Sequence, residues 1–326
     1  MKQAPFEAAH RAEWDAFERF LETGKSVKGD APATQLEPAE MPLRYRRVCH
    51  SLALAADRQY SPELVDRLNQ LALRGHHALY AYRGRQSQRI VDFFLATFPA
   101  LVREEWRLVC AAALLFFGPL AALLALLQFV PEFVHYLLTP EQIAAAHQMY
   151  DPANKQLGMR EADTSLLMLG YYIWNNVKIG FQTFAGGVLA GLGTVWFLAS
   201  NAVMIGAVAG YLTQIGFSRT FWSFVAGHSS LELLAIVLTG AAGLRLGFGV
   251  IAPGGRSRKA ALVAAAQPAV RLMYGAAVMF GLAAFVEAFW SPLTAVPFSV
   301  KIAAGIAGWA LLVCYFLLAG RAHATH

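Results

Sequence analysis

The residues with the clearest chemical potential form the run Gly227-His228-Ser229-Ser230-Leu231-Glu232. This run lies inside a segment, residues 221–251, that otherwise consists mostly of Ala, Leu, Val, Gly and Phe. His228 and Glu232 are four positions apart, so they share one face of a helix. An ionisable side chain inside a bilayer costs roughly 3 kcal/mol on insertion scales. Such residues persist where they face a partner, a cavity or a site, and we take this pair as the start of a candidate functional site.

The composition is that of a polytopic membrane protein. Of the 326 residues, 57% are hydrophobic and only 15% are charged, against about 25% charged in an average soluble domain. The net charge of +6 fits basic cytoplasmic loops, and no basic stretch interleaved with aromatic residues indicates a nucleic-acid partner. We predict an all-α fold. A cytoplasmic helical domain over residues 1–105, ending in an amphipathic helix at 89–106, precedes a transmembrane helix bundle over residues 106–326.

About six apolar segments are long enough to cross a bilayer. A long polar loop, residues 131–163, follows the first of them, and Thr139 and Pro140 indicate a short helix within this loop. Ser200 and Asn201 are expected to divide the long apolar stretch after it into two helices. The loop at 256–259 carries three basic and no acidic residues, so it is expected to be cytoplasmic. Both chain termini then lie in the cytoplasm and the 131–163 loop lies outside. The six segments are residues 108–130, two within 166–212, 221–251, 261–289 and 300–318.

This topology places several polar residues from different helices in the same half of the bilayer. We predict that they form an intramembrane polar cluster that faces the interior of the bundle and opens to the outer side. Its members are Asn175, Asn176, His228, Glu232 and Glu287.

The residue types in this cluster leave three interpretations open. The first is structural, with hydrogen bonds between helices, for example from His228 to Glu287. The second is a divalent metal site, in which His228, Glu232 and Glu287 bind an ion such as Zn²⁺; the His-x-x-x-Glu spacing lacks the second histidine of a zincin-type pattern. The third is a proton or solute path, or a cleft for a lipid or cell-wall precursor. Hydrolysis by Ser229 with His228 is disfavoured because adjacent helix positions do not face each other.

Two pairs of glycines, each four residues apart, indicate close packing of helices. Gly187 with Gly191, and Gly206 with Gly210, form small-xxx-small faces that allow backbones to approach. We expect these faces to support a homodimer. Arg245, near the cytoplasmic end of its segment, is expected to extend to the lipid headgroups.

Several motifs together resemble the stage II sporulation protein M family of DUF95-type membrane proteins, over roughly residues 88–320. The resemblance implies five or six helices in the bacterial inner membrane, with both termini in the cytoplasm. In spore formers the namesake resembles a membrane scaffold for cell-wall hydrolases. The additional N-terminal domain is similar to that of longer homologues from non-sporulating bacteria, which are commonly encoded beside MoxR-type ATPases and von Willebrand A-type proteins. The motifs are Asn175-Asn176, the glycine-rich run 185–193, the run from Asn201 to Gly206, the run from Gly227 to Glu232, and Glu287-Ala288-Phe289.

We therefore expect an inner-membrane scaffold protein of envelope or peptidoglycan remodelling. It would recruit partners, such as a MoxR-type ATPase or cell-wall enzymes, through the cytoplasmic domain and the external loop. The alternative is a membrane transporter or a metal-dependent intramembrane hydrolase that works at the His/Glu cluster.

Overall fold

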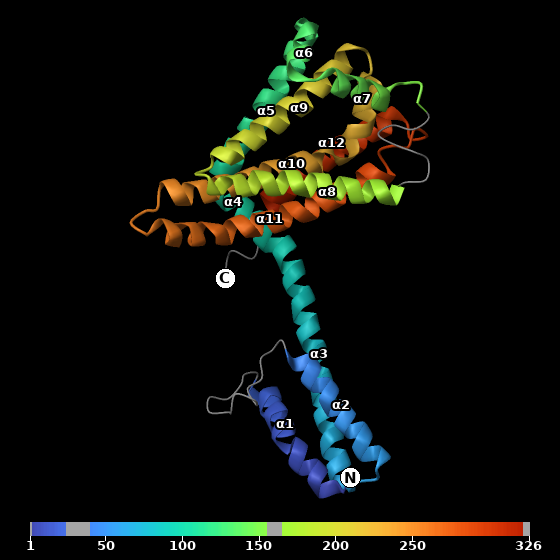
Figure 1. Cartoon of the computed structure of the whole chain (residues 1–326). Coiled ribbons are helices and arrows are strands. Elements are labelled where there is room, and N and C mark those ends of the chain that lie inside the picture. Colours follow the sequence, from blue (N-terminus) through green and yellow to red (C-terminus); the bar gives the residue numbers. More distant parts are fainter. Residues whose placement is uncertain (1, 24–39, 155–164, 322–326) are drawn as a thin grey trace. The chain divides into compact units, whose positions relative to one another are not determined.

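The protein is all-α, as predicted. The computed structural model describes residues 2–23, 40–154 and 165–321, and every regular element in these ranges is a helix (Figure 1). Residues 155–163 of the predicted external loop lie outside the described ranges. The chain divides into two compact units, Met1–Asp92 and Phe93–His326. The boundary thus falls after Asp92, whereas the sequence places it at residue 105.

The N-terminal unit is a three-helix arrangement of α1 (Gln3–Thr23), α2 (Met41–Asp57) and α3 (Pro62–Asp92). Trp14 and Phe17 of α1, Val48 of α2 and Leu68 of α3 are buried together in its core. These residues recur at helical spacing, so each helix turns one apolar stripe inward.

Arginines of α2 and α3 hold the acidic face of α1. Arg44 and Arg47 donate to the same Glu13 carboxylate oxygen at 3.0 and 3.1 Å. Burial alone would raise the pKa of Glu13, but the hydrogen bonds from the two arginines outweigh it and hold this pKa below its ordinary value. The unit therefore has its own apolar core and its own ion pairs.

Within its described residues, the membrane unit contains five helices that are long and apolar enough to cross a bilayer: α5, α9, α10, α11 and α12. The sequence predicts about six. The remaining long helix, α8, is not among the five because Asn175, Asn176 and Lys178 make its middle polar, yet it packs against α10 and α11 within the bundle. The elements are η2 (Phe93–Thr97), α4 (Phe98–Glu104), α5 (Trp106–Phe129), η3 (Pro131–Phe133), α6 (Val134–Leu137), α7 (Pro140–Tyr150), α8 (Ser165–Ala185), η4 (Gly186–Val188), α9 (Leu192–Gln214), α10 (Ser218–Ile251), α11 (Arg258–Phe289) and α12 (Phe298–Leu318).

The long helices of the membrane unit run between two ends. The basic end carries the loop 253–257 between α10 and α11, and the α7 end carries α7 and the turn at 290–297. Helix α7 begins as predicted, with Thr139 accepting a hydrogen bond from the backbone of Gln142 in a capping box.

The break between α8 and α9 lies at residues 186–191, and the prediction of a break at Ser200 and Asn201 is wrong. Ala190 and Gly191 have positive φ angles of 52° and 82°, which reverse the chain direction. Asn201 lies inside α9, where its Nδ2 donates to the Phe197 carbonyl at 2.7 Å. An asparagine can stay inside a helix because its side-chain amide can bond to a carbonyl of the preceding turn. Residues with left-handed backbone, in contrast, end a helix.

The four glycines singled out in the sequence lie at close contacts within the chain. A Cβ on Gly187 would lie 2.1 Å from the Gly243 carbonyl oxygen of α10. A Cβ on Gly206 would lie 2.9 Å from the Leu120 carbonyl oxygen of α5, and one on Gly210 would meet Leu127. The Gly191 backbone lies against Gly247 of α10, where a Cβ on Gly247 would lie 2.5 Å from the Gly191 nitrogen. These faces are covered inside one protomer, so a homodimer would have to use another surface.

The predicted amphipathic helix before the first span packs on the membrane bundle. The Phe98 ring of α4 covers Gly275 of α11, whose Cβ would lie 2.0 Å from that ring. Arg103 donates to the Phe316 carbonyl of α12 at 2.7 Å. Arg245 of α10, expected at the headgroups, instead pairs with Glu105 at 3.0 Å.

We expect Gly187→Val to destabilise the membrane unit by about 3 kcal/mol, because the new side chain would collide with the α10 backbone. Gly170→Ala is the matched control, since no atom lies within 4 Å of the added Cβ. It should leave stability unchanged or raise it by up to about 1 kcal/mol. Thermal unfolding in detergent micelles measures both. A Gly187→Val protein that unfolds like the parent would contradict this packing.

Candidate functional site

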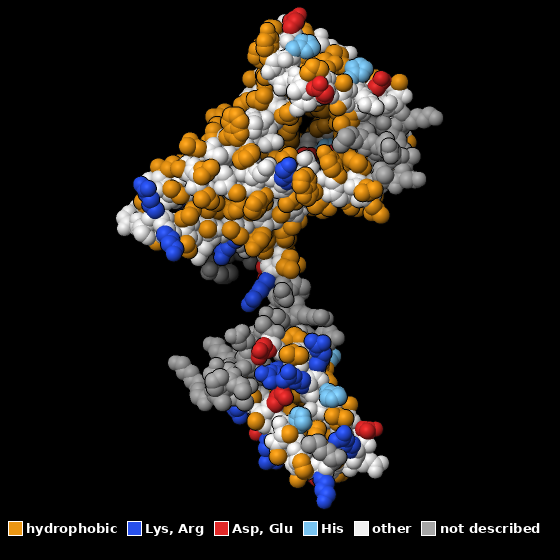
Figure 2. Space-filling model, viewed as in Figure 1, with side chains coloured by type: hydrophobic (Ala, Val, Ile, Leu, Met, Phe, Trp, Pro, Cys, Tyr) orange, Lys and Arg blue, Asp and Glu red, His pale blue; other side chains and the backbone are white. Residues whose placement is uncertain are grey.

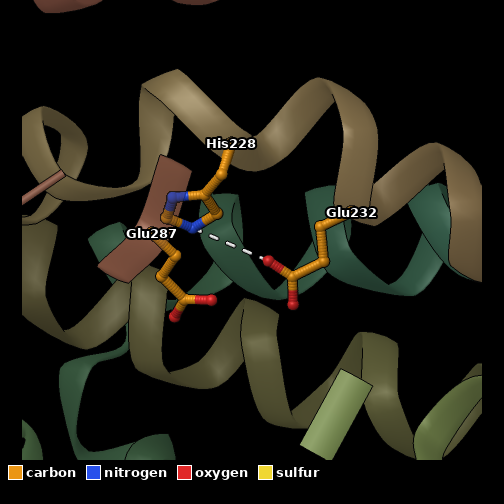
Figure 3. Close-up of side chains that lie close together, drawn as sticks. All are labelled: His228, Glu232 and Glu287. Carbon is orange, nitrogen blue, oxygen red and sulfur yellow. Dashed lines mark ion pairs between the residues drawn. The ribbon is translucent and has the colours of Figure 1, made fainter. Parts of the chain in front are cut away.

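The side chains of His228, Glu232 and Glu287 point toward one another within the membrane unit (Figure 3). Each offers one metal-ligand atom, and these three atoms all lie within 4.8 Å of one another. His228 Nε2 is 3.6 Å from Glu232 Oε2. The structure therefore brings together the three residues that the sequence analysis proposes as possible metal ligands.

The packing of α11 on α10 places Glu287 in this cluster. Ala283, Ala284 and Ala288 of α11 are fully buried, and Glu287 lies within the same helical stripe. Small side chains there let α11 approach α10 closely. A carboxylate on this stripe must point into the bundle, toward the His228 and Glu232 face of α10.

The two asparagines of α8 extend the cluster on its other side. Asn175 Nδ2 donates to Asn176 Oδ1 at 3.2 Å, and the Asn176 residue is only 2% exposed. The Asn176 side chain interacts with the Glu287 carboxyl group. All five predicted cluster residues thus lie in one region of the membrane unit.

His228 is oriented by a residue that the sequence analysis does not identify. His228 Nδ1 lies 2.9 Å from Ser291 Oγ, and the Ser291 carbonyl accepts a hydrogen bond from Lys301 Nζ at 2.6 Å. Lys301 is fully buried, and its ammonium lies 5.7 Å from the centre of the Trp290 ring. With Nδ1 engaged, Nε2 is left facing the two carboxylates. The sequence signal that could have pointed to this region was Lys301, a cation near the start of an apolar span.

The glycine that precedes His228 in the motif has a packing role. A Cβ on Gly227 would lie 2.1 Å from the Trp290 ring. A Cβ on Gly305 of α12 would lie 2.6 Å from the Ala226 carbonyl oxygen. These two glycines let the 290–297 turn and α12 approach α10, which brings Ser291 to the imidazole.

Tyr150, at the end of α7, closes the cluster from the α7 end. Its ring contacts Phe224, with centroids 5.7 Å apart, and Phe224 in turn contacts the His228 ring at 5.5 Å. Burial raises the pKa of the Tyr150 hydroxyl above its ordinary value, and the nearby charge of Glu287 raises it further. Sequence reasoning misses Tyr150 because the loop carrying it is far from the motif along the chain.

The geometry accommodates a metal ion as well as a structural role. His228 hydrogen-bonds to Ser291 in the 290–297 turn, which is a contact between segments of the kind that the structural interpretation predicts. Ligand atoms around a tetrahedral Zn²⁺ with bonds of about 2.0 Å lie about 3.3 Å apart. Small side-chain rotations would bring the three ligand atoms, now within 4.8 Å, to that spacing. One imidazole and two carboxylates are ligands that Zn²⁺ accepts.

Residues 108–292 match the family described as stage II sporulation protein M, which covers more than half of the chain. The chain belongs to the stage II sporulation protein M family. The matched region includes His228, Glu232, Glu287 and Ser291, so the candidate site lies inside the part that defines the family. Residues 4–81 match a second family, described as a domain of unknown function (DUF8413). Comparison with curated proteins gives no match, and neither does comparison with solved structures.

We expect Glu287→Gln to raise the stability of the metal-free protein by about 1 kcal/mol. The metal-free cluster holds two carboxyl groups within 4.8 Å of each other, so one of them must either take up a proton or repel the other in an apolar interior. The neutral amide of glutamine removes that cost. Residues kept for chemistry commonly cost stability in this way.

Glu105→Gln is the matched control for that measurement, because Glu105 pairs with Arg245 at 3.0 Å and the variant should melt at a lower temperature. Thermal unfolding in a chelator-containing buffer compares the two. If both variants are destabilised, the cluster is a structural network.

Proposed function

We propose that this protein is a metal-dependent membrane protein of the bacterial envelope, with a divalent cation such as Zn²⁺ held by His228, Glu232 and Glu287. One observation carries the proposal: an imidazole nitrogen and two carboxylates from α10 and α11 converge with their ligand atoms within 4.8 Å. Buried charges of like sign are expensive inside a bilayer, and a bound cation removes that cost.

The reaction class that this arrangement supports best is hydrolysis. A Zn²⁺ ion with three protein ligands keeps a fourth position for water and makes that water a nucleophile near neutral pH. Ser291 fixes the imidazole through Nδ1, as outer-shell partners of metal-binding histidines do. The Asn176 amide interacts with Glu287, where it can donate a hydrogen bond to a substrate oxygen.

Transport is less well supported by the packing. A transporter needs a path from the cluster to both ends of the unit. Toward the basic end, residues 235–243 of α10 are all buried, and the backbone of the α8–α9 turn lies directly against Gly243. Along α10 the described residues leave no polar path in that direction.

The proposal includes a location in the inner membrane with both termini in the cytoplasm. The basic loop at 256–259 supports this orientation through the excess of positive charge in cytoplasmic loops. The α7 end then faces outward, and the His/Glu cluster lies in the outer half of the bilayer.

We expect the purified protein to bind about one Zn²⁺ per chain, and His228→Ala to lose it, because removing one of three ligands leaves only two carboxylates. His135→Ala is the matched control, since His135 is exposed in α6, away from the cluster. Metal content by elemental analysis after zinc loading and dialysis measures both. Retention of zinc by His228→Ala would rule out the proposed site.

The second candidate function is that of a scaffold for envelope or peptidoglycan remodelling. The N-terminal unit favours it, because this unit has its own core and matches a family of its own. A separate helical unit on a membrane protein is suited to docking a soluble partner, such as a MoxR-type ATPase, while α6 and α7 would face cell-wall enzymes.

For the scaffold role we expect a MoxR-type ATPase to co-purify with the full-length protein and not with a variant that lacks residues 1–92. The interaction surface lies on the separate N-terminal unit in this proposal. Equal zinc content and equal melting temperature in the two preparations provide the control. Co-purification with both forms, or with neither, would contradict docking through that unit.

A further inference from the structure

Of the two cluster residues on α10, the one further from the α7 end is the more exposed. The His228 side chain, nearer that end, is 5% exposed, whereas the Glu232 side chain, one helical turn further in, is 18% exposed. An opening at the α7 end would expose His228 more than Glu232. These two exposures favour access to Glu232 from a direction other than the α7 end.

The α7 end is closed by aromatic packing. The Tyr150 ring lies against Phe221 and Phe224, at centroid distances of 5.2 and 5.7 Å. Thr220 Oγ1 donates to the Tyr150 carbonyl at 2.6 Å, which ties the end of α7 to α10. Ala209 and Leu212 of α9 are buried in the same cluster. A polar solute from that side would have to displace this stack.

The basic end is closed by backbone contacts. Thr194 of α9 donates to the Thr183 carbonyl of α8 at 2.8 Å. Gly186 and Gly193 lie so close that a Cβ on either would clash with the other's backbone. Helices α8 and α9 are thus joined tightly at this end, and from there they diverge toward the α7 end (Figure 1).

The remaining approach is sideways, between the diverging helices. Figure 2 shows a hollow in the membrane unit between α9 and α8, and its described rim carries hydrophobic side chains and a basic one. Lys178 of α8 lies over the Trp174 ring, with its Nζ 4.8 Å from the ring centre. Trp174 and Phe181 of α8, and Trp196 and Met204 of α9, are exposed. Helix α9 is apolar enough to span a bilayer, so a gap in its side opens toward acyl chains rather than toward water.

We propose that the substrate of this centre is a membrane lipid that enters sideways between α8 and α9, with its acyl chains in the bilayer and its polar group at Glu232 and Glu287. This inference rests on the metal-dependent function proposed above. An amphiphile is the class of molecule that can follow an apolar side entrance and still present a hydrolysable polar bond to a buried His/Glu/Glu centre. A water-soluble substrate has no such route.

Two carbodiimides test the route, because both react with protonated carboxyl groups but differ in the phase they occupy. Addition of the carboxyl O–H across a C=N bond gives an O-acylisourea, which rearranges to a stable N-acylurea, so no other reagent is needed. In reconstituted, zinc-free protein we expect the lipid-soluble dicyclohexylcarbodiimide to modify Glu232 or Glu287 at least about tenfold faster than the water-soluble ethyl(dimethylaminopropyl)carbodiimide. Peptide mass spectrometry locates the adduct, and Glu232→Gln with Glu287→Gln should abolish it.

Two zinc-binding probes test the substrate class. In zinc-loaded protein we expect palmitohydroxamic acid to bind at least about tenfold more tightly than acetohydroxamic acid. The concentration of each compound is expressed as its mole fraction in the micelle, so that partitioning into the micelle does not affect the comparison. Equal affinities, or equal labelling by the two carbodiimides, would overturn the lipid proposal, and so would a complete lack of labelling.

The same preparations separate this inference from the metal proposal. Zinc should protect the two carboxyl groups from the lipid-soluble carbodiimide. Labelling that zinc does not slow, in protein that binds no zinc, would overturn the metal site and leave the side entrance intact. Zinc binding together with equal labelling by both reagents would overturn the side entrance alone.

Discussion

The close packing of α10 against α11 and the 290–297 turn determines the whole candidate site. Gly227 lies under the Trp290 ring, and a row of buried alanines on α11 faces α10. This approach brings Ser291 to His228 and Glu287 to both residues of the His-x-x-x-Glu pair. Ionisable groups inside a membrane bundle are costly and are by default candidates for a functional site, which is the basis of the metal-dependent function that we propose.

The parts of the fold that depend on local patterns could be predicted from the sequence. Apolar stretches identified the spans, and the Thr139-Pro140 start of α7 has the capping geometry that its residues indicate. The sequence misplaces the α8–α9 turn because polar Ser200 and Asn201 indicate a break, whereas the chain reverses in the apolar, glycine-containing run 186–191, where Ala190 and Gly191 have positive φ angles. The middle of α8 is polar enough that the number of spans also differs from the prediction.

The candidate site shows the same division. His228, Glu232, Glu287, Asn175 and Asn176 could be found because a polar residue in an apolar segment is conspicuous. Tyr150 and Ser291 could not, because they lie in connecting segments, where polar and aromatic residues are ordinary. Their roles follow from tertiary contacts: the phenol of Tyr150 is buried against Phe224, and the Ser291 hydroxyl meets the imidazole. The direction of access to the cluster was inferred from the exposed fractions of the His228 and Glu232 side chains. The spacing of residues in the sequence does not give these fractions.

X-ray absorption spectroscopy at the zinc edge tests the central claim most directly. For zinc-loaded protein the proposed site predicts a first shell of nitrogen and oxygen atoms at about 2.0–2.2 Å, the multiple-scattering signature of one imidazole, and no sulfur. A spectrum with sulfur ligands at about 2.3 Å, or with two or more imidazoles, would place the metal elsewhere in the chain and contradict the account.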